Sequence, residues 1–205
     1  REQHIKRERA TSNICTASAL MASMTGFYCV YNGPEGLRRA AETAHLATAT
    51  VARALEAMDY RLASKEFFDT LEVSAEAAVV QSLALESGIN FYYPTEGSVR
   101  MSFDEVTTPE EVAEVIRIFA AAKGRKAKAV KPVTESRVPA ALRRRTAYLS
   151  EAVFNTYRSE SDLMRYIKKL ELRDISLANS MISLGSCTMK LNAAALSRSR
   201  WRASR

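Results

Sequence analysis

The side chains best suited to chemistry lie in one short stretch near the C-terminus, Ser180–Asn192. Gly185 permits a turn that a residue with a Cβ would resist. Three small polar residues follow it and a lysine stands close behind: Ser186, Cys187, Thr188 and Lys190. If the alanines at 193–195 begin a helix, its free N–H groups would face the same turn, which could then hold a carboxylate or a phosphate. The alternative is an ordinary turn and helix N-cap, where Ser and Thr are favoured in any case.

The sequence offers little support for a metal site. Its three cysteines are an odd number at wide spacings, and only His4 and His45 stand beside them. Soft ligands are therefore too few for any recognised zinc spacing. We expect no metal and, for Cys15, Cys29 and Cys187, reduced thiols in an intracellular compartment. His45 lies off the apolar seam of its predicted helix, so we expect it on the surface.

The positive charge of the chain is concentrated in one segment. The net charge is +7, and residues 125–145 carry eight basic residues against Glu135, which accounts for the whole excess. A basic run can mark a nucleic-acid footprint. Here no aromatic residue is interleaved before Tyr148, and Pro132 and Pro139 interrupt the run. We therefore expect a solvated linker and no nucleic-acid partner.

Two further features bear on where the chain works. It contains no uncharged apolar run of about 18 residues, so we expect no membrane span. Residues 1–10 are heavily charged and begin with Arg, which does not fit a signal peptide. We expect this start to be a cut inside a longer protein.

The hydrophobic pattern predicts an α+β unit over residues 11–124. Apolar residues at helical spacing alternate with short stretches rich in aromatic and β-branched residues, which favour strands. Thr108-Pro109-Glu110-Glu111 is a strong helix start, with a cap, a proline at the first position and a glutamate at the third. Strands on one side with helices on the other make a domain of roughly a hundred residues. The predicted elements are helices at 11–31, 37–58, 75–86 and 108–123, and strands at 67–73, 89–93 and 99–104.

A connector and a second unit are predicted to follow. Residues 125–150 form the connector, and Ser159-Glu160-Ser161-Asp162 is another capping box. The helix that it begins carries apolar residues on one face: Leu163, Met164, Ile167 and Leu170. This helix leads toward Ser180–Asn192, so residues 154–192 are predicted to begin a new unit.

Three runs of residues together resemble one protein family. The first run is Arg1–Ile5 continuing through Ala10–Thr16, the second is Phe154–Tyr157 with Tyr166–Leu170, and the third is Leu184–Asn192. They are similar to the P-protein of the glycine cleavage system, the decarboxylating glycine dehydrogenase. The similarity runs from Arg1 to about Ala195, nearly the whole chain.

The resemblance implies a fold and a division of the chain. The family has two tandem halves, each shaped like a fold-type I pyridoxal-phosphate enzyme, and only the second half is catalytic. The α+β unit would then be the small domain of the first half. The implied parts are the end of that half's large domain (1–33), its small domain (34–123), a basic linker (124–153), the start of the catalytic half (154–195) and an aberrant tail (196–205).

The resemblance also implies an activity. The family decarboxylates glycine with pyridoxal phosphate as the electron sink and passes the aminomethyl group to the lipoyl arm of H-protein. The cofactor lysine sits in a His-Lys motif followed by glycines, and none of the nine lysines here has that context. We therefore expect no catalytic residue in this chain, and no activity of the chain alone. The implied partners are glycine, lipoylated H-protein and a homodimer or the paired halves of the parent enzyme, in the bacterial cytoplasm or the mitochondrial matrix.

In the family, the run that matches Gly185–Asn192 lies at the mouth of the active site. The residues that the resemblance brings near substrate or cofactor, without individual roles, are Ser186, Cys187, Thr188, Lys190 and Asn192. Ser183 stands where the family usually has proline, which leaves the approach to Gly185 less rigid. Residues 196–205 leave the family pattern, and our hypothesis for them is a reading-frame slip or an assembly break in the gene.

Two other functions stay open at the level of sequence. A non-catalytic scaffold or partner subunit could complete another chain's active site, although a separate half would not be expected to join both halves across residues 124–155. A nucleic-acid binder would depend on residues 125–145 and on the tail, and it would show steeply salt-dependent retention of DNA.

Overall fold

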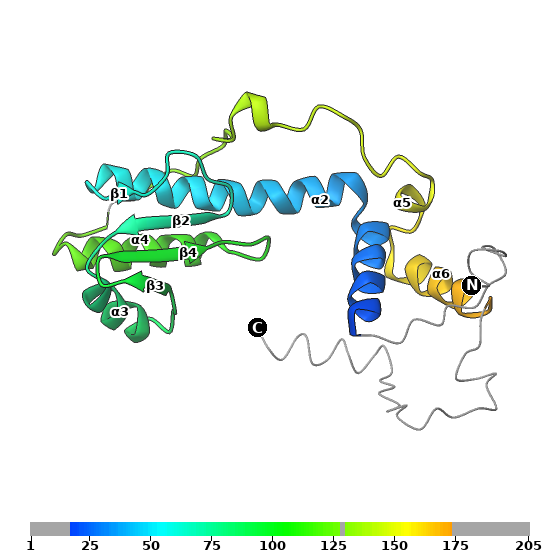
Figure 1. Cartoon of the computed structure of the whole chain (residues 1–205), viewed down its shortest axis with the longest axis horizontal. Helices are drawn as coiled ribbons and strands as arrows, with labels where there is room; N and C mark the ends of the chain where they lie inside the picture. The colour runs from blue at the N-terminus through cyan, green and yellow to red at the C-terminus, as the bar shows by residue number, and fades with distance from the viewer. Residues whose placement is uncertain (1–16, 128–129, 174–205) are drawn as a thin grey trace, which may run out of the picture. The chain divides into compact units, whose positions relative to one another are not determined.

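The computed structural model describes residues 17–127 and 130–173. The chain divides into two compact units, one made of Cys15–Glu160 and the other of Arg1–Ile14 with Ser161–Arg205. All the strands that the structure describes belong to the first unit (Figure 1). The predicted α+β fold class is confirmed by this unit.

The first unit begins with a long helix, α2 (Ala17–Ala57), that is broken at one residue. Gly33 has φ 59° and ψ −173°, a combination that essentially only glycine adopts. Pro34 follows in the first turn of the second helical segment, where its fixed φ is compatible with a helix and its missing N–H costs nothing. The predicted break over residues 32–36 is therefore a kink at Gly33 alone, and helix resumes at once.

Four antiparallel strands form one sheet, in the order β1-β2-β4-β3. Its two longest strands alternate between an apolar face and a polar face, as half-buried strands do. In their register, buried Leu71 pairs with Met101 and Val73 with Val99, whereas Glu72 pairs with Arg100 on the exposed face. The strands are β1 (Arg61–Leu62), β2 (Thr70–Ser74), β3 (Tyr92–Thr95) and β4 (Ser98–Ser102).

Helices cover the apolar face of this sheet. The second segment of α2 lies against it together with α3 (Ala77–Glu86) and α4 (Pro109–Ala122), and Figure 1 shows β2 and β4 in front of α4. Phe119 of α4 is fully buried at the centre, with its ring edge-on to Tyr60 at 5.4 Å between centroids. Burial of each such side chain contributes about 1.5–3 kcal/mol, so this core accounts for the cohesion of the unit.

The strand boundaries differ from those predicted. The stretch predicted as a strand from Phe67 enters the sheet only at Thr70, because the rings of Phe67 and Phe68 pack beside His45 instead. The predicted strand at 89–93 enters the sheet only at Tyr92.

The sheet and the helices that cover it are called the sheet unit below. Residues 130–158, which we call the strap, return along α2 after α4, the last helix of the sheet unit (Figure 1). They contain a 3₁₀ turn at Ala140–Leu142 and the short helix α5 (Val153–Thr156). Most of the basic side chains between Arg125 and Arg145 are exposed, as expected for a solvated segment. The backbone of the strap is nevertheless bonded to α2 at several points.

The second unit is represented among the described residues by α6 (Glu160–Glu171), whose first residue is the last of the first unit. The helix forms where the capping box predicted it. Two ion pairs lie within the helix, between Asp162 and Arg165 and between Lys168 and Glu171. No helix in the described part of the chain has both the length and the apolar character needed to cross a membrane.

Candidate functional site

The residues predicted to lie near substrate or cofactor, Ser186, Cys187, Thr188, Lys190 and Asn192, fall outside the described residues. The geometry available for a functional site is therefore that of the first unit, where two open pockets among the described residues are large enough to hold a ligand.

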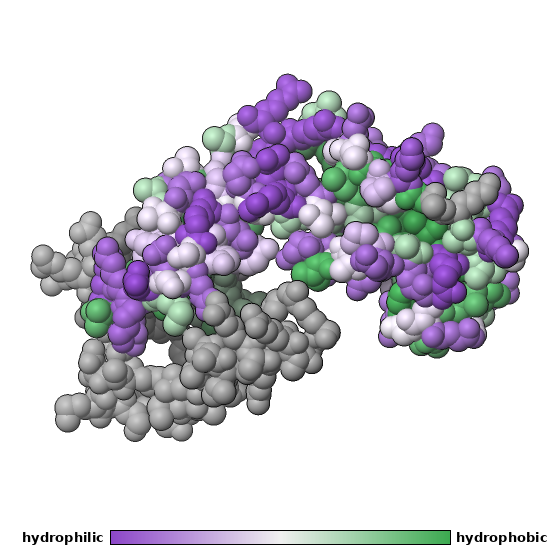
Figure 2. All heavy atoms as spheres, turned by 180° about the vertical axis from the view of Figure 1, so that it is seen from behind, coloured by the Kyte–Doolittle hydropathy of each residue, from purple (hydrophilic) through white to green (hydrophobic). Residues whose placement is uncertain are grey.

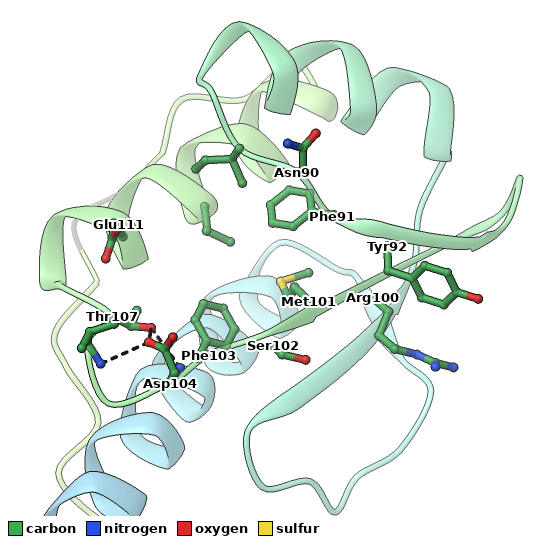
Figure 3. A pocket seen from close by; sticks show the side chains of 13 residues that line it. Asn90, Phe91, Tyr92, Arg100, Met101, Ser102, Phe103, Asp104, Thr107 and Glu111 are labelled. Carbon is green, nitrogen blue, oxygen red and sulfur yellow. Dashed lines mark hydrogen bonds between the residues drawn. The ribbon is translucent and has the colours of Figure 1, made fainter. Parts of the chain in front are cut away.

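The first pocket opens where β3 and β4 diverge. Tyr92 still pairs with Arg100, but the residues before it, 89–91, are not paired as a strand. The space between them and the end of β4 measures about 590 Å³ and is shown in Figure 3. Arg100 lies 5.5 Å above the Tyr92 ring and donates to Glu72, so the charged side chains at this end are already paired.

The floor of this pocket is apolar. Met101 and Phe103 lie on the inward face of the strand and loop, Phe91 comes from the segment before β3, and Val115 comes from α4. The alternation in β4 explains the first two, since residues two apart lie on the same face of a strand. Figure 3 shows the rings of Phe91 and Phe103 on either side of the cavity.

The polar groups at the mouth of the pocket hold the chain turn before α4. The carboxylate of Asp104 accepts from the Val106 N–H at 3.1 Å and from the Thr107 hydroxyl at 2.9 Å. The carboxylate of Glu111 accepts from the Thr108 N–H at 2.7 Å, and the Thr108 hydroxyl accepts from the Glu111 N–H at 3.2 Å. These bonds are the predicted capping box and its preceding turn, and they commit both acids to local structure.

The second pocket, of about 840 Å³, lies between α2, α4 and the segment that contributes Ala127, Val130, Pro132 and Val133. Apolar side chains line most of it, including Leu46, Val112 and Ile116. Figure 2, seen from behind the view of Figure 1, shows apolar surface among polar patches on the face of the sheet unit.

One ion pair at the rim of the second pocket is strongly formed. Two nitrogens of Arg117 donate to the carboxylate of Glu114, at 2.8 Å and 2.5 Å, and one of them also donates to the Ser87 hydroxyl. Hydrogen bonding to Arg117 lowers the pKa of Glu114 to about 2. Glu114 is therefore ionised at neutral pH, which does not suit a general base or acid there.

His45 was predicted from the sequence to lie on the surface. This prediction is wrong, because only 2% of the residue is exposed. Its Nδ1 lies 2.9 Å from the Phe68 carbonyl oxygen, and its Nε2 accepts from the Arg137 N–H at 2.9 Å. A carbonyl can only accept and an amide N–H can only donate, so these partners select the neutral tautomer with the proton on Nδ1. The ring also stacks on Phe68, at 5.5 Å and 12°.

The described residues do not fit a pyridoxal-phosphate site. Neither pocket is lined by a lysine. The amino group of Lys123 donates to the carbonyls of Met58 and Asp59, just after the C-terminus of α2, and lies 4.1 Å above the Tyr60 ring. It is therefore engaged in structural contacts. The other lysines in the described ranges are exposed. Within those same ranges, no cluster of His, Cys, Asp or Glu could hold a metal ion.

The two pockets do not indicate a protein family, but comparison with known proteins does. Residues 1–119 match the family model described as "Glycine cleavage system P-protein". The chain belongs to the glycine cleavage system P-protein family. The predicted resemblance of the sequence to this family is thereby confirmed.

Individual P-proteins match over nearly the whole chain. The "Glycine dehydrogenase (decarboxylating)" of Flavobacterium johnsoniae is 51% identical over 195 residues, which cover 95% of this chain and 20% of that protein. The protein of the same name from Thermosynechococcus vestitus is 46% identical over 198 residues, with the same coverage of each chain. This chain therefore spans about a fifth of the length of these P-proteins.

A solved structure in the same family was also matched. It is the glycine decarboxylase (P-protein) of the glycine cleavage system in inhibitor-bound form, with 26% identity and a TM-score of 0.45. The match covers 58% of this P-protein chain and 30% of the solved one.

Proposed function

We propose that this chain is a segment of a glycine dehydrogenase (decarboxylating). The observation that carries the proposal is the 51% identity to the Flavobacterium johnsoniae protein across 95% of the chain. Identity of this extent covers the motif runs as well as the sheet unit. The segment then contributes to decarboxylation of glycine and transfer of the aminomethyl group to the lipoyl arm of H-protein, in the cytoplasm of a bacterial cell.

Pyridoxal phosphate would supply the electron sink for loss of carbon dioxide when bound to the parent enzyme. Neither of the two pockets is lined by a lysine, and the carboxylates of Asp104, Glu111 and Glu114 in them are bonded to turn residues or to Arg117. We therefore assign no chemical step to them. Their part in this proposal is to form a stably packed domain of the non-catalytic half.

The proposed division of the chain follows the family. Residues 34–123 form the small domain of the first, non-catalytic half, which agrees with the self-contained core of the sheet unit. Residues 124–153 link the two halves and 154–195 open the catalytic half. In that opening we propose Ser186, Cys187, Thr188, Lys190 and Asn192 as residues close to substrate or cofactor.

Segment exchange tests the proposal. The matching stretch of the Flavobacterium johnsoniae enzyme is replaced by residues 1–195 of this chain, and release of labelled carbon dioxide from glycine is measured with lipoylated H-protein. We expect activity to be kept, and we expect none from the 205-residue chain alone with pyridoxal phosphate and glycine. A folded hybrid without activity would refute the assignment. Borohydride-stable attachment of pyridoxal phosphate to a lysine of the isolated chain would refute its proposed inactivity.

A further inference from the structure

The kink in α2 has an unusual neighbour. The guanidinium of Arg158 occupies the space above the Cα of Gly33, so that a Cβ at this position would clash with Nη1 and Nη2. The same guanidinium lies 3.5 Å from the Tyr31 carbonyl oxygen, to which it donates. A helix that breaks leaves carbonyls of its last turn without helical partners, and Arg158 supplies a donor there.

Arg158 is itself held by the end of the strap. Its Nη2 donates to the Asn155 side-chain oxygen at 3.2 Å. The amide nitrogen of Asn155 donates in turn to the carbonyls of Leu149 and Glu151, at 2.9 Å and 3.1 Å. The turn that carries Arg158 is thus closed by its own hydrogen bonds before it meets α2.

The strap contacts both sides of the kink. The Tyr148 hydroxyl donates to the Pro34 carbonyl at 2.7 Å, on the second helical segment, whereas Arg158 contacts Tyr31 on the first. Two groups only ten residues apart in the strap therefore bridge the break in α2. A bridge of this kind restricts the angle between the two segments, because any change of angle must break one of the two contacts.

Farther along α2 the strap is fastened three more times. The Arg137 N–H donates to His45, the Val133 N–H donates to the Thr50 hydroxyl at 2.9 Å, and Arg53 donates to the Lys131 carbonyl. These contacts fix the position from which Tyr148 and Arg158 reach the kink.

We propose that the strap is a lock for the hinge at Gly33, with Arg158 as the wedge and Tyr148 as the second contact. Glycine supplies the backbone freedom for a hinge, and the strap removes that freedom while it is docked. Release of the strap frees the first segment of α2 to change its angle to the sheet unit. The proposal concerns the conformation of this chain and does not depend on the enzymatic assignment.

Distance measurements by electron spin resonance test the lock on the full 205-residue chain. Spin labels are placed at Ser23→Cys and Arg39→Cys, both exposed and on opposite sides of the kink, with Cys15, Cys29 and Cys187 replaced by Ser. Arg158→Ala combined with Tyr148→Phe is expected to widen the distance distribution, by roughly twofold, because both contacts across the hinge are then lost. Arg145→Ala, which removes an exposed basic side chain of the same strap, is the matched control and should leave the distribution unchanged.

Two further variants keep the outcome decisive. Asn155→Ala should widen the distance distribution, because the group that orients Arg158 is lost. Arg158→Lys should give a distribution between those of the wild type and of Arg158→Ala, because lysine keeps the charge but lacks the planar fork of the guanidinium. Circular dichroism confirms that helix content is kept in every variant. A distribution that stays as narrow as that of the wild type in the Arg158→Ala, Tyr148→Phe chain would overturn the proposal and assign the kink to Gly33 and Pro34 alone.

Discussion

His45 and Arg137 are joined by a hydrogen bond of 2.9 Å from the Arg137 N–H to the imidazole Nε2, although 92 residues separate them in the chain. The guanidinium of Arg137 pairs with Glu56 at 3.1 Å and lies 5.1 Å above the Phe67 ring. One residue of the strap is therefore attached by its backbone to a buried ring and by its side chain to the surface of α2. The two attachments can be separated by mutation.

His45→Ala should destabilise the first unit by about 2–3 kcal/mol, because it removes two hydrogen bonds and leaves the Phe68 carbonyl and the Arg137 N–H without their partner. Arg137→Ala keeps the backbone bond and loses an ion pair near the surface, so the expected cost is below about 1 kcal/mol. Urea denaturation followed by circular dichroism gives both values. Equal losses in the two variants would show that the backbone bond to His45 is not the main attachment.

The contrast between His45 and the capping box shows which features a sequence can reveal. The start of α4 was predicted correctly because Thr108, Pro109 and Glu111 are neighbours in sequence and their bonds are local. The position of His45 depends on partners 23 and 92 residues away. The spacing of His45 from the apolar residues of its own helix gives no information about these distant partners.

The strap and the kink follow the same rule. Gly33 and Pro34 signalled a break in α2, but the occupation of that break by Arg158, 125 residues later, requires the fold. The expected solvent exposure of the basic side chains between Arg125 and Arg145 was correct for those that the structure describes, but the hydrogen bonds from the strap backbone to α2 were not predicted. For the region of Ser186–Asn192, outside the described residues, the assignment still depends on the family motif and stays a prediction.

Glu114→Gln should destabilise the first unit modestly at pH 7, and the difference from wild type should shrink to a small remainder at pH 2. The pKa of Glu114 is lowered to about 2 from an ordinary value of 4.5 by its bonds to Arg117. A lowered folded-state pKa contributes stability that is fully present above pH 4.5 and is lost as the pH falls toward 2. The measurement is the difference in free energy of unfolding between wild type and variant across this pH range.

Glu96→Gln is the matched control for this pH dependence, since Glu96 is an exposed loop acid. Its difference from wild type should be small and without a trend below pH 4.5. Added salt should reduce the Glu114 effect at pH 7, because about a third of that side chain is exposed and the pair is screened. A Glu114→Gln difference that grows on acidification would contradict the assignment.

Thr108→Ala should remove one half of the capping box that begins α4 and borders the first pocket. The expected cost is about 1 kcal/mol, which corresponds to about 2–4 °C in the melting temperature of a unit as long as Cys15–Glu160. Thr108→Ser keeps the hydroxyl and should stay within about 0.5 kcal/mol of wild type. If the Ala and Ser variants melt together below the wild type, the methyl group and not the cap is what stabilises this turn.

Phe119→Ala should be among the most damaging single changes in the sheet unit. The ring is fully buried, lies edge-on to Tyr60 and is 5.8 Å from the Phe91 ring, which forms one wall of the first pocket. Its removal leaves a cavity between the sheet and two helices, with an expected loss of about 3–5 kcal/mol. Urea denaturation measures the loss, and hydrogen exchange of β4 amides should accelerate because the core that contains Val99 and Met101 of β4 is then less well packed. Leu85→Ala, on α3 and 57% exposed, is the control and should change stability by less than about 0.5 kcal/mol. A loss below about 1 kcal/mol for Phe119→Ala would mean that this cluster is not the core that holds the sheet to its helices.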